Sequence, residues 1–65
     1  MTEKQKRFAN EYIIDLNATR AYKATYPKVK SDSTASVNAS KLLRNAKVKA
    51  YIEELMKERA KRTEI

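Results

Sequence analysis

The chain has 65 residues and contains no Cys, His or Gly, and 15 Lys and Arg against 8 Asp and Glu give it a formal net charge of +7. A chain of this length forms one domain, and its composition excludes support from a disulfide or from a typical zinc site. Because Gly is absent, Pro occurs once and good helix formers are abundant, the sequence predicts an all-α bundle of about four helices.

The excess of positive charge favours a polyanionic partner, of which nucleic acid is the commonest. A membrane surface is the competing partner, but a membrane-binding helix needs a broad apolar face rich in Trp, Phe or Leu. This chain has no Trp, and Phe8 is its one Phe. No segment approaches the ~20 apolar residues of a membrane span. We therefore expect an intracellular protein that makes no membrane contact.

The first predicted helix begins after Thr2, because Thr2 and Gln5 have the spacing of a capping box. Phe8, Tyr12 and Leu16 are expected on its buried side, and Ile14 on its exposed side. Asn17 breaks this helix and caps the next, at residues 18–25. The packed face of the second helix is predicted to consist of mostly small residues, Ala18, Ala21, Tyr22 and Thr25.

Four basic residues in and after the second helix are candidates for phosphate contacts. Arg20 and Lys23 are expected to point outward from it, where a solvated basic face is an equal alternative. Pro27 ends the helix, and Lys28 and Lys30 follow in a turn beside the next helix. Lysines at such a place are suited to contacts with the DNA backbone.

The third predicted helix, residues 33–44, is capped by Ser31, Asp32 or Ser33 and has two different faces. Ala35, Ala39, Leu42 and Leu43 form its apolar stripe. The opposite face consists of Ser33, Thr34, Val37, Ser40, Lys41 and Arg44. Short hydroxyl side chains allow close approach to base edges, valine can contact a thymine methyl group, and Lys and Arg reach guanine or phosphate. This face is therefore predicted to enter a DNA groove, with simple solvation as the alternative.

A fourth helix is predicted from about Ala46 to Arg62, after a joint at Asn45 that suits either a left-handed position or an N-cap. Its apolar stripe is Val48, Tyr51, Ile52, Leu55 and Met56. The predicted core of the whole bundle is Phe8, Tyr12, Leu16, Ala21, Ala39, Leu42, Val48, Ile52 and Leu55. No Gly or Pro ends the fourth helix, so we expect that the natural protein continues beyond residue 65.

Catalytic chemistry is not predicted. The serines have no His to activate them, and Glu53 and Glu54 diverge on a helix, so they cannot converge on one metal ion. We expect a binding module without enzymatic activity, metal or cofactor.

Several segments together resemble the N-terminal domain of bacteriophage terminase small subunits. They are Thr2-Glu3-Lys4-Gln5-Lys6-Arg7-Phe8, Glu11-Tyr12, Asp15-Leu16-Asn17-Ala18-Thr19, Ala21-Tyr22, Leu42-Leu43-Arg44-Asn45 and the stretch from Val48 through Ala50-Tyr51-Ile52. The family usually has Ala-Gly-Tyr at the end of the second helix, where this chain has Ala24-Thr25-Tyr26, and the following turn is longer here.

The resemblance implies a helix-turn-helix domain over residues 1–65 that binds double-stranded DNA at the phage packaging site, in the cytoplasm of the bacterial host. It also implies a terminase large subunit as partner, which carries the ATPase and nuclease, and a homo-oligomer formed through a region beyond residue 65. Two other functions stay open: a helix-turn-helix transcription regulator or transposase domain, and a helical oligomerisation module without specific DNA binding.

Overall fold

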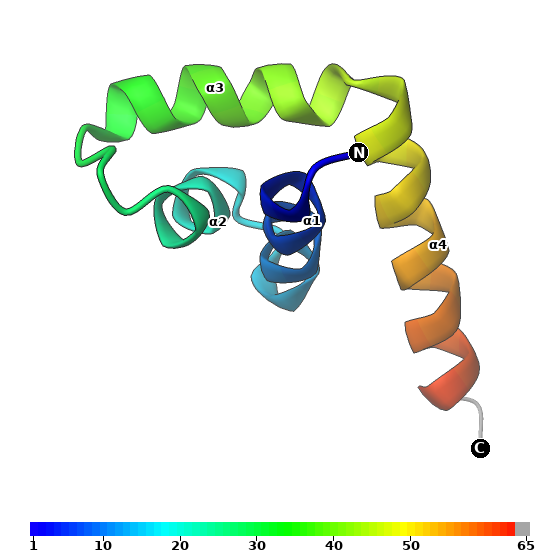
Figure 1. Cartoon of the computed structure of the whole chain (residues 1–65). Coiled ribbons are helices and arrows are strands. Elements are labelled where there is room, and N and C mark those ends of the chain that lie inside the picture. Colours follow the sequence, from blue (N-terminus) through cyan, green and yellow to red (C-terminus); the bar gives the residue numbers. More distant parts are fainter. Residues whose placement is uncertain (64–65) are drawn as a thin grey trace.

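A computed structural model of the chain describes the backbone of residues 1–63 and the side chains of residues 1–58. Those residues form four helices, α1 (Glu3–Asp15), α2 (Ala18–Thr25), α3 (Asp32–Arg44) and α4 (Ala46–Thr63), which confirms the all-α prediction. Helix α3 lies across one side of α1 and α2, and α4 turns away from the end of α3 and packs along α1 (Figure 1). None of the described helices covers the other side of α3 (Figure 1).

The helix starts follow the capping chemistry that the sequence predicts. The Thr2 hydroxyl accepts a hydrogen bond from Gln5 N at 3.1 Å, and Thr2 N donates to Gln5 Oε1 at 3.1 Å. Asn17 Oδ1 accepts from Arg20 N at 3.0 Å at the start of α2. Ser31 Oγ accepts from Thr34 N at 3.4 Å, so Ser31 is the cap among the three candidates and α3 begins at Asp32, one residue before the predicted range.

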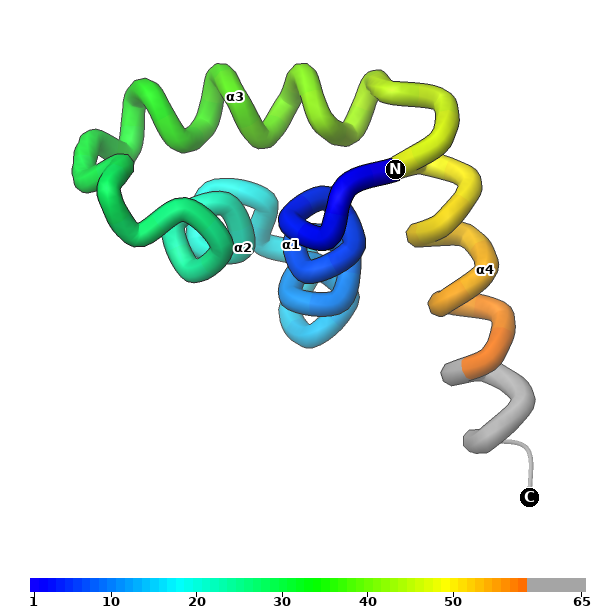
Figure 2. The backbone as a smooth tube through the Cα atoms, in the orientation of Figure 1, coloured from blue at the N-terminus to red at the C-terminus, as the bar shows by residue number. Residues whose placement is uncertain are grey.

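The joint between α3 and α4 is formed by Asn45, where the backbone turns a corner that Figure 2 shows clearly. Its Oδ1 accepts from Lys47 N at 3.0 Å and from Val48 N at 3.4 Å, which confirms the capping role. The backbone of Asn45 is extended, with φ −67° and ψ 121°, and is not left-handed. The predicted end of the fourth helix, Arg62, differs by one residue from Thr63, and the predicted continuation past residue 65 lies outside the described residues.

The core is small and is built largely from alanine and a few larger side chains. Its buried residues are Phe8, Ala9, Ala21, Ala39, Val48 and Ile52. Five of the nine predicted core residues belong to this cluster, and Tyr12, Leu42 and Leu55 pack against it while partly exposed. Close approach of alanine-rich helix faces places α3 firmly on α2, which fixes the orientation of its outer side.

Leu16 was predicted in the core, and this prediction is wrong. Helix α1 ends at Asp15, and Leu16 adopts a left-handed conformation with φ 57° and ψ 27° while its N–H donates to Tyr12 O at 2.7 Å. This change of backbone direction leaves the Leu16 side chain 58% exposed. Ile14 is 60% exposed, as predicted.

Candidate nucleic-acid interface

The outer side of α3 carries the predicted groove-facing residues. Ser33, Thr34, Val37, Ser40, Lys41 and Arg44 are all exposed. On the inner side of the same helix, Ala35 and Ala39 are completely buried. The predicted rotation of this helix is therefore confirmed, and hydroxyl groups, a branched methyl side chain and two cations share one surface. Such a surface can offer hydrogen bonds to base edges and charge to phosphates.

The turn between α2 and α3 adds two more exposed cations, Lys28 and Lys30. Val29 N donates to Tyr26 O at 3.0 Å, which closes the first part of this turn around Pro27. Among the side chains that the structure describes, those of Lys28, Lys30, Lys41 and Arg44 form no ion pair and no hydrogen bond. Their charges are available to an external anion.

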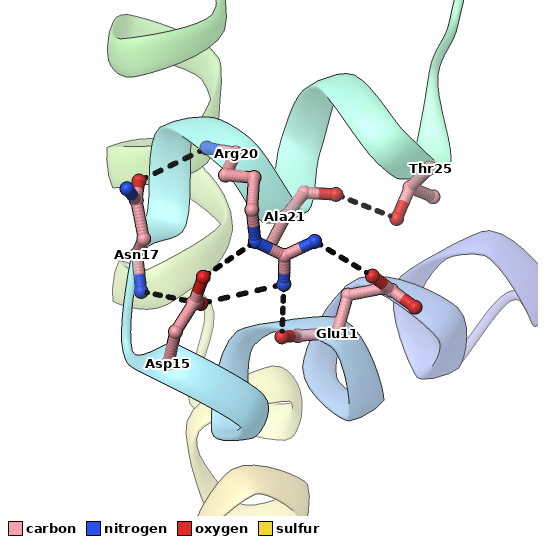
Figure 3. A network of polar contacts seen from close by, with 6 residues as sticks. All are labelled: Glu11, Asp15, Asn17, Arg20, Ala21 and Thr25. Atoms are coloured by element: carbon pink, nitrogen blue, oxygen red, sulfur yellow. Dashed lines mark hydrogen bonds and ion pairs between the residues drawn. The ribbon is translucent and has the colours of Figure 1, made fainter.

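Arg20 does not point outward as predicted, because its guanidinium folds back onto α1 (Figure 3). Its Nε donates to Asp15 Oδ2 at 2.6 Å, and its Nη2 donates to Asp15 Oδ1 at 3.3 Å. Its Nη1 donates to Glu11 Oε1 at 2.9 Å, and Nη2 also donates to the Glu11 carbonyl at 2.7 Å. Arg20 therefore joins the end of α1 to the start of α2.

These contacts shift the titration of both charged groups. The hydrogen bond from the Arg20 guanidinium holds the pKa of Asp15 below its ordinary value, against a smaller opposing effect of burial. Asp15 and Glu11 in turn raise the pKa of Arg20 above its ordinary range. The three side chains are partly open to water, so solvent screens this network.

Lys23 also has an internal carboxylate partner, because its Nζ lies 2.6 Å from Asp32 Oδ1. The pair joins α2 to the first turn of α3, and the Asp32 side chain is 78% exposed. Sequence reasoning missed these pairings because each one crosses a helix boundary. The one local signal was the presence of Asp15 and Asp32 close to the two ends of α2.

A chain of aromatic contacts ends at a lysine that the sequence did not single out. Tyr22 packs edge-on against Phe8 at 6.3 Å and stacks on Tyr26 at 4.4 Å between ring centroids. Lys4 Nζ lies 5.1 Å from the centroid of the Tyr26 ring. Burial and the neighbouring Tyr22 raise the pKa of the Tyr26 hydroxyl above its ordinary value. Lys4 and Lys28 both line a small open cavity beside Tyr26.

Comparison with known proteins bears on what this basic surface is for. All 65 residues, 1–65, match the family described as "Terminase small subunit". The chain belongs to this family. It is also similar to the terminase small subunit of Staphylococcus phage 80alpha, with 47% identity over 58 residues, covering 89% of this chain and 38% of the relative. No solved structure matches the chain.

The chain thus spans 38% of the length of the curated relative that it matches.

Near the end of α2 this chain has Thr25, at the position where the family pattern described above has a glycine. Thr25 is 4% exposed, and its hydroxyl donates to Ala21 O at 2.9 Å.

None of the described helices combines the length and apolarity needed to cross a membrane.

Proposed function

We propose that this chain binds double-stranded DNA by inserting the outer side of α3 into the major groove. The observation that carries the proposal is the division of α3 into a fully buried alanine side and an exposed polar and basic side. Lys41 and Arg44 lie among short side chains, so the helix backbone can approach the base edges. Lys28 and Lys30 contact the backbone phosphates next to the groove.

Within the terminase small subunit family, the DNA site is the packaging site of the phage genome, which the small subunit presents to the large subunit. The large subunit carries the ATPase and nuclease, and the chain itself has no catalytic role and no cofactor. Residues 1–65 act as the DNA-binding domain of a protein that forms a homo-oligomer through a region beyond residue 65, in the cytoplasm of the bacterial host. Several such domains engaged together compensate for the small footprint of one.

Titration of packaging-site DNA and random duplex DNA at a series of salt concentrations tests this function. If each domain neutralises four to six phosphates, log K falls against log salt with a slope of about −4 to −5. Packaging-site DNA is expected to bind more tightly than random DNA at each salt concentration. An affinity that does not change with salt overturns DNA binding and favours an oligomerisation module.

Chemical-shift mapping with the same duplexes tests the assignment to α3. The amide signals of residues 33–44 and of the preceding turn are expected to move on titration. If the shifts concentrate on α1 and α4 while residues 33–44 are silent, α3 is not the helix that reads DNA. Equal binding to packaging-site and random DNA, or preference for another sequence, favours the transcription regulator or transposase alternative over packaging.

A further inference from the structure

The small cavity beside the turn between α2 and α3 brings together residues from two segments that are far apart in the sequence. It measures about 220 Å³ and is lined by Lys4, Tyr26, Pro27, Lys28 and Val29. Lys4 belongs to the first turn of α1, and Lys28 belongs to the turn between α2 and α3. The cavity is thus an open, partly apolar hollow with one cation from each side and no carboxylate among its lining residues.

The aromatic contacts connect Tyr26, which lines this cavity, to the core. Phe8 is completely buried, Tyr22 packs against it, and Tyr26 stacks on Tyr22 with an angle of 25° between the rings. The Lys4 ammonium lies above the Tyr26 ring, where the cation–π attraction at an exposed site is only about 0.5–1 kcal/mol. The lysine is therefore held near the turn but is free to exchange the ring for a stronger anionic partner.

Neither cation is neutralised by a side chain in the part of the domain that the structure describes. Among the described side chains, no carboxylate lies within ion-pair distance of Lys4 or Lys28. Arg20 and Lys23 differ from them in this respect, because each of these has a carboxylate partner. Two unneutralised ammonium groups around one hollow favour a bound anion of the size of a phosphate group.

The position of the cavity indicates where this anion comes from. Lys28 lies in the turn that leads directly into α3, so an anion held here is adjacent to the groove that α3 enters. Phosphates of a DNA strand flank a recognition helix in this way and position it without reading sequence. The start of α1 lies beside the end of α2, on the same side of the domain (Figure 1).

We propose that Lys4 and Lys28 clamp one DNA backbone phosphate over Tyr26, so that α1 as well as the turn contributes to the DNA interface. This inference rests on the proposed function. The clamp sets the angle at which α3 enters the groove, and it increases affinity for all duplex sequences to a similar extent. Lys4 is accordingly a DNA-contacting residue outside α2, α3 and the turn between them.

Substitution of Lys4 tests the clamp against a matched control on the same helix. Lys4→Ala and Lys28→Ala are each expected to reduce the salt slope by about 0.9 and to weaken random and packaging-site DNA equally. Lys6→Ala removes the same charge from an exposed position two residues away that does not line the cavity, and it is expected to leave the slope unchanged. Unfolding midpoints close to that of the unsubstituted chain confirm that the variants are folded.

A second pair of variants tests the role of the ring. Tyr26→Phe retains the aromatic face and is expected to bind DNA with nearly the original slope, whereas Tyr26→Leu loses the face that holds Lys4 and is expected to resemble Lys4→Ala. If Lys4→Ala and Lys6→Ala have equal effects while the unsubstituted chain binds with a steep slope, the clamp is wrong and the proposed function stands. If the unsubstituted chain does not bind duplex DNA at all, both proposals fail.

Discussion

The basic residues of α2 and those of α3 with its preceding turn face different partners. Arg20 and Lys23 on α2 are bonded to carboxylates of α1 and α3, whereas Lys41 and Arg44 on α3 are exposed and carry no such bond within the described residues. A high positive charge therefore does not mean that every cation contacts the polyanion. Some of the cations hold the helices in place, and the others are presented by the structure that results.

The largest effect is expected from reversing the charge of the α3 surface. Lys41→Glu combined with Arg44→Glu lowers the net charge from +7 to +3 and places like charges against phosphates. Since each contact of Lys41 or Arg44 with a base is worth about 1–3 kcal/mol, we expect the affinity for DNA to fall by roughly a hundredfold or more in fluorescence titrations.

A matched double variant separates local contact from total charge. Lys47→Glu with Lys57→Glu makes the same change in net charge on exposed positions of α4. We expect only a modest loss of affinity from this pair, because long-range attraction is screened at physiological salt. Equal losses from the two double variants contradict a DNA interface centred on α3.

Removal of the Arg20 side chain is expected to affect stability and to leave the DNA contacts intact. Arg20→Ala breaks the bonds to Glu11 and Asp15 that hold α2 on α1. Because solvent screens these pairs, we expect Tm to fall by roughly a few degrees, while the salt slope of DNA binding measured below Tm is unchanged. Arg7→Ala, an exposed position on α1, removes the same charge with little effect on Tm. A slope reduced by about one in Arg20→Ala shows that Arg20 contacts phosphate after all.

Local rules of sequence predicted much of the fold, because caps and helix periodicity depend on neighbours within four residues. Thr2, Asn17 and Ser31 are caps for this reason, and the rotation of α3 follows from the spacing of Ala35 and Ala39. Candidate residues on α3 and in the turn were placed correctly at the surface.

Pairings between helices were not predictable in this way. The direction of Arg20 depends on how α2 is placed against α1, and the meeting of Lys4 with Tyr26 depends on the packing of three aromatic rings. Leu16 was misplaced because the helical period was continued by one residue past the actual end of α1. The two wrong predictions, for Arg20 and Leu16, lie near helix ends, where the chain changes direction and periodicity carries no information.

A smaller effect is expected from titration of Asp15. Its folded-state pKa lies below the ordinary value of 3.8, so its contribution to stability is complete above that pH and is lost as the pH falls through the folded value. Urea unfolding at several pH values from about 6 to about 2 is expected to show this loss. Asp15→Asn and Arg20→Ala both remove the pair and are expected to show a shallower decline on acidification. The same acid-induced decline in all three proteins contradicts the assignment to this pair.

The smallest effect is expected at Leu16, which ends the helix that Arg20 ties to α2. A non-glycine residue at φ 57° has a conformational cost that glycine avoids, and the Leu16 side chain contributes little burial because it is 58% exposed. Leu16→Gly is therefore expected to stabilise the domain by about 0.5–1 kcal/mol in urea unfolding, after the larger flexibility of glycine in the unfolded chain is taken into account. Ile14→Gly is the control, since Ile14 is 60% exposed but lies inside α1, and it is expected to destabilise by roughly 0.5–1 kcal/mol. Destabilisation of similar size by both substitutions means that the Leu16 side chain makes contacts whose contribution outweighs the conformational cost of its backbone. In that case apolar packing, as well as Arg20, holds the connection between α1 and α2.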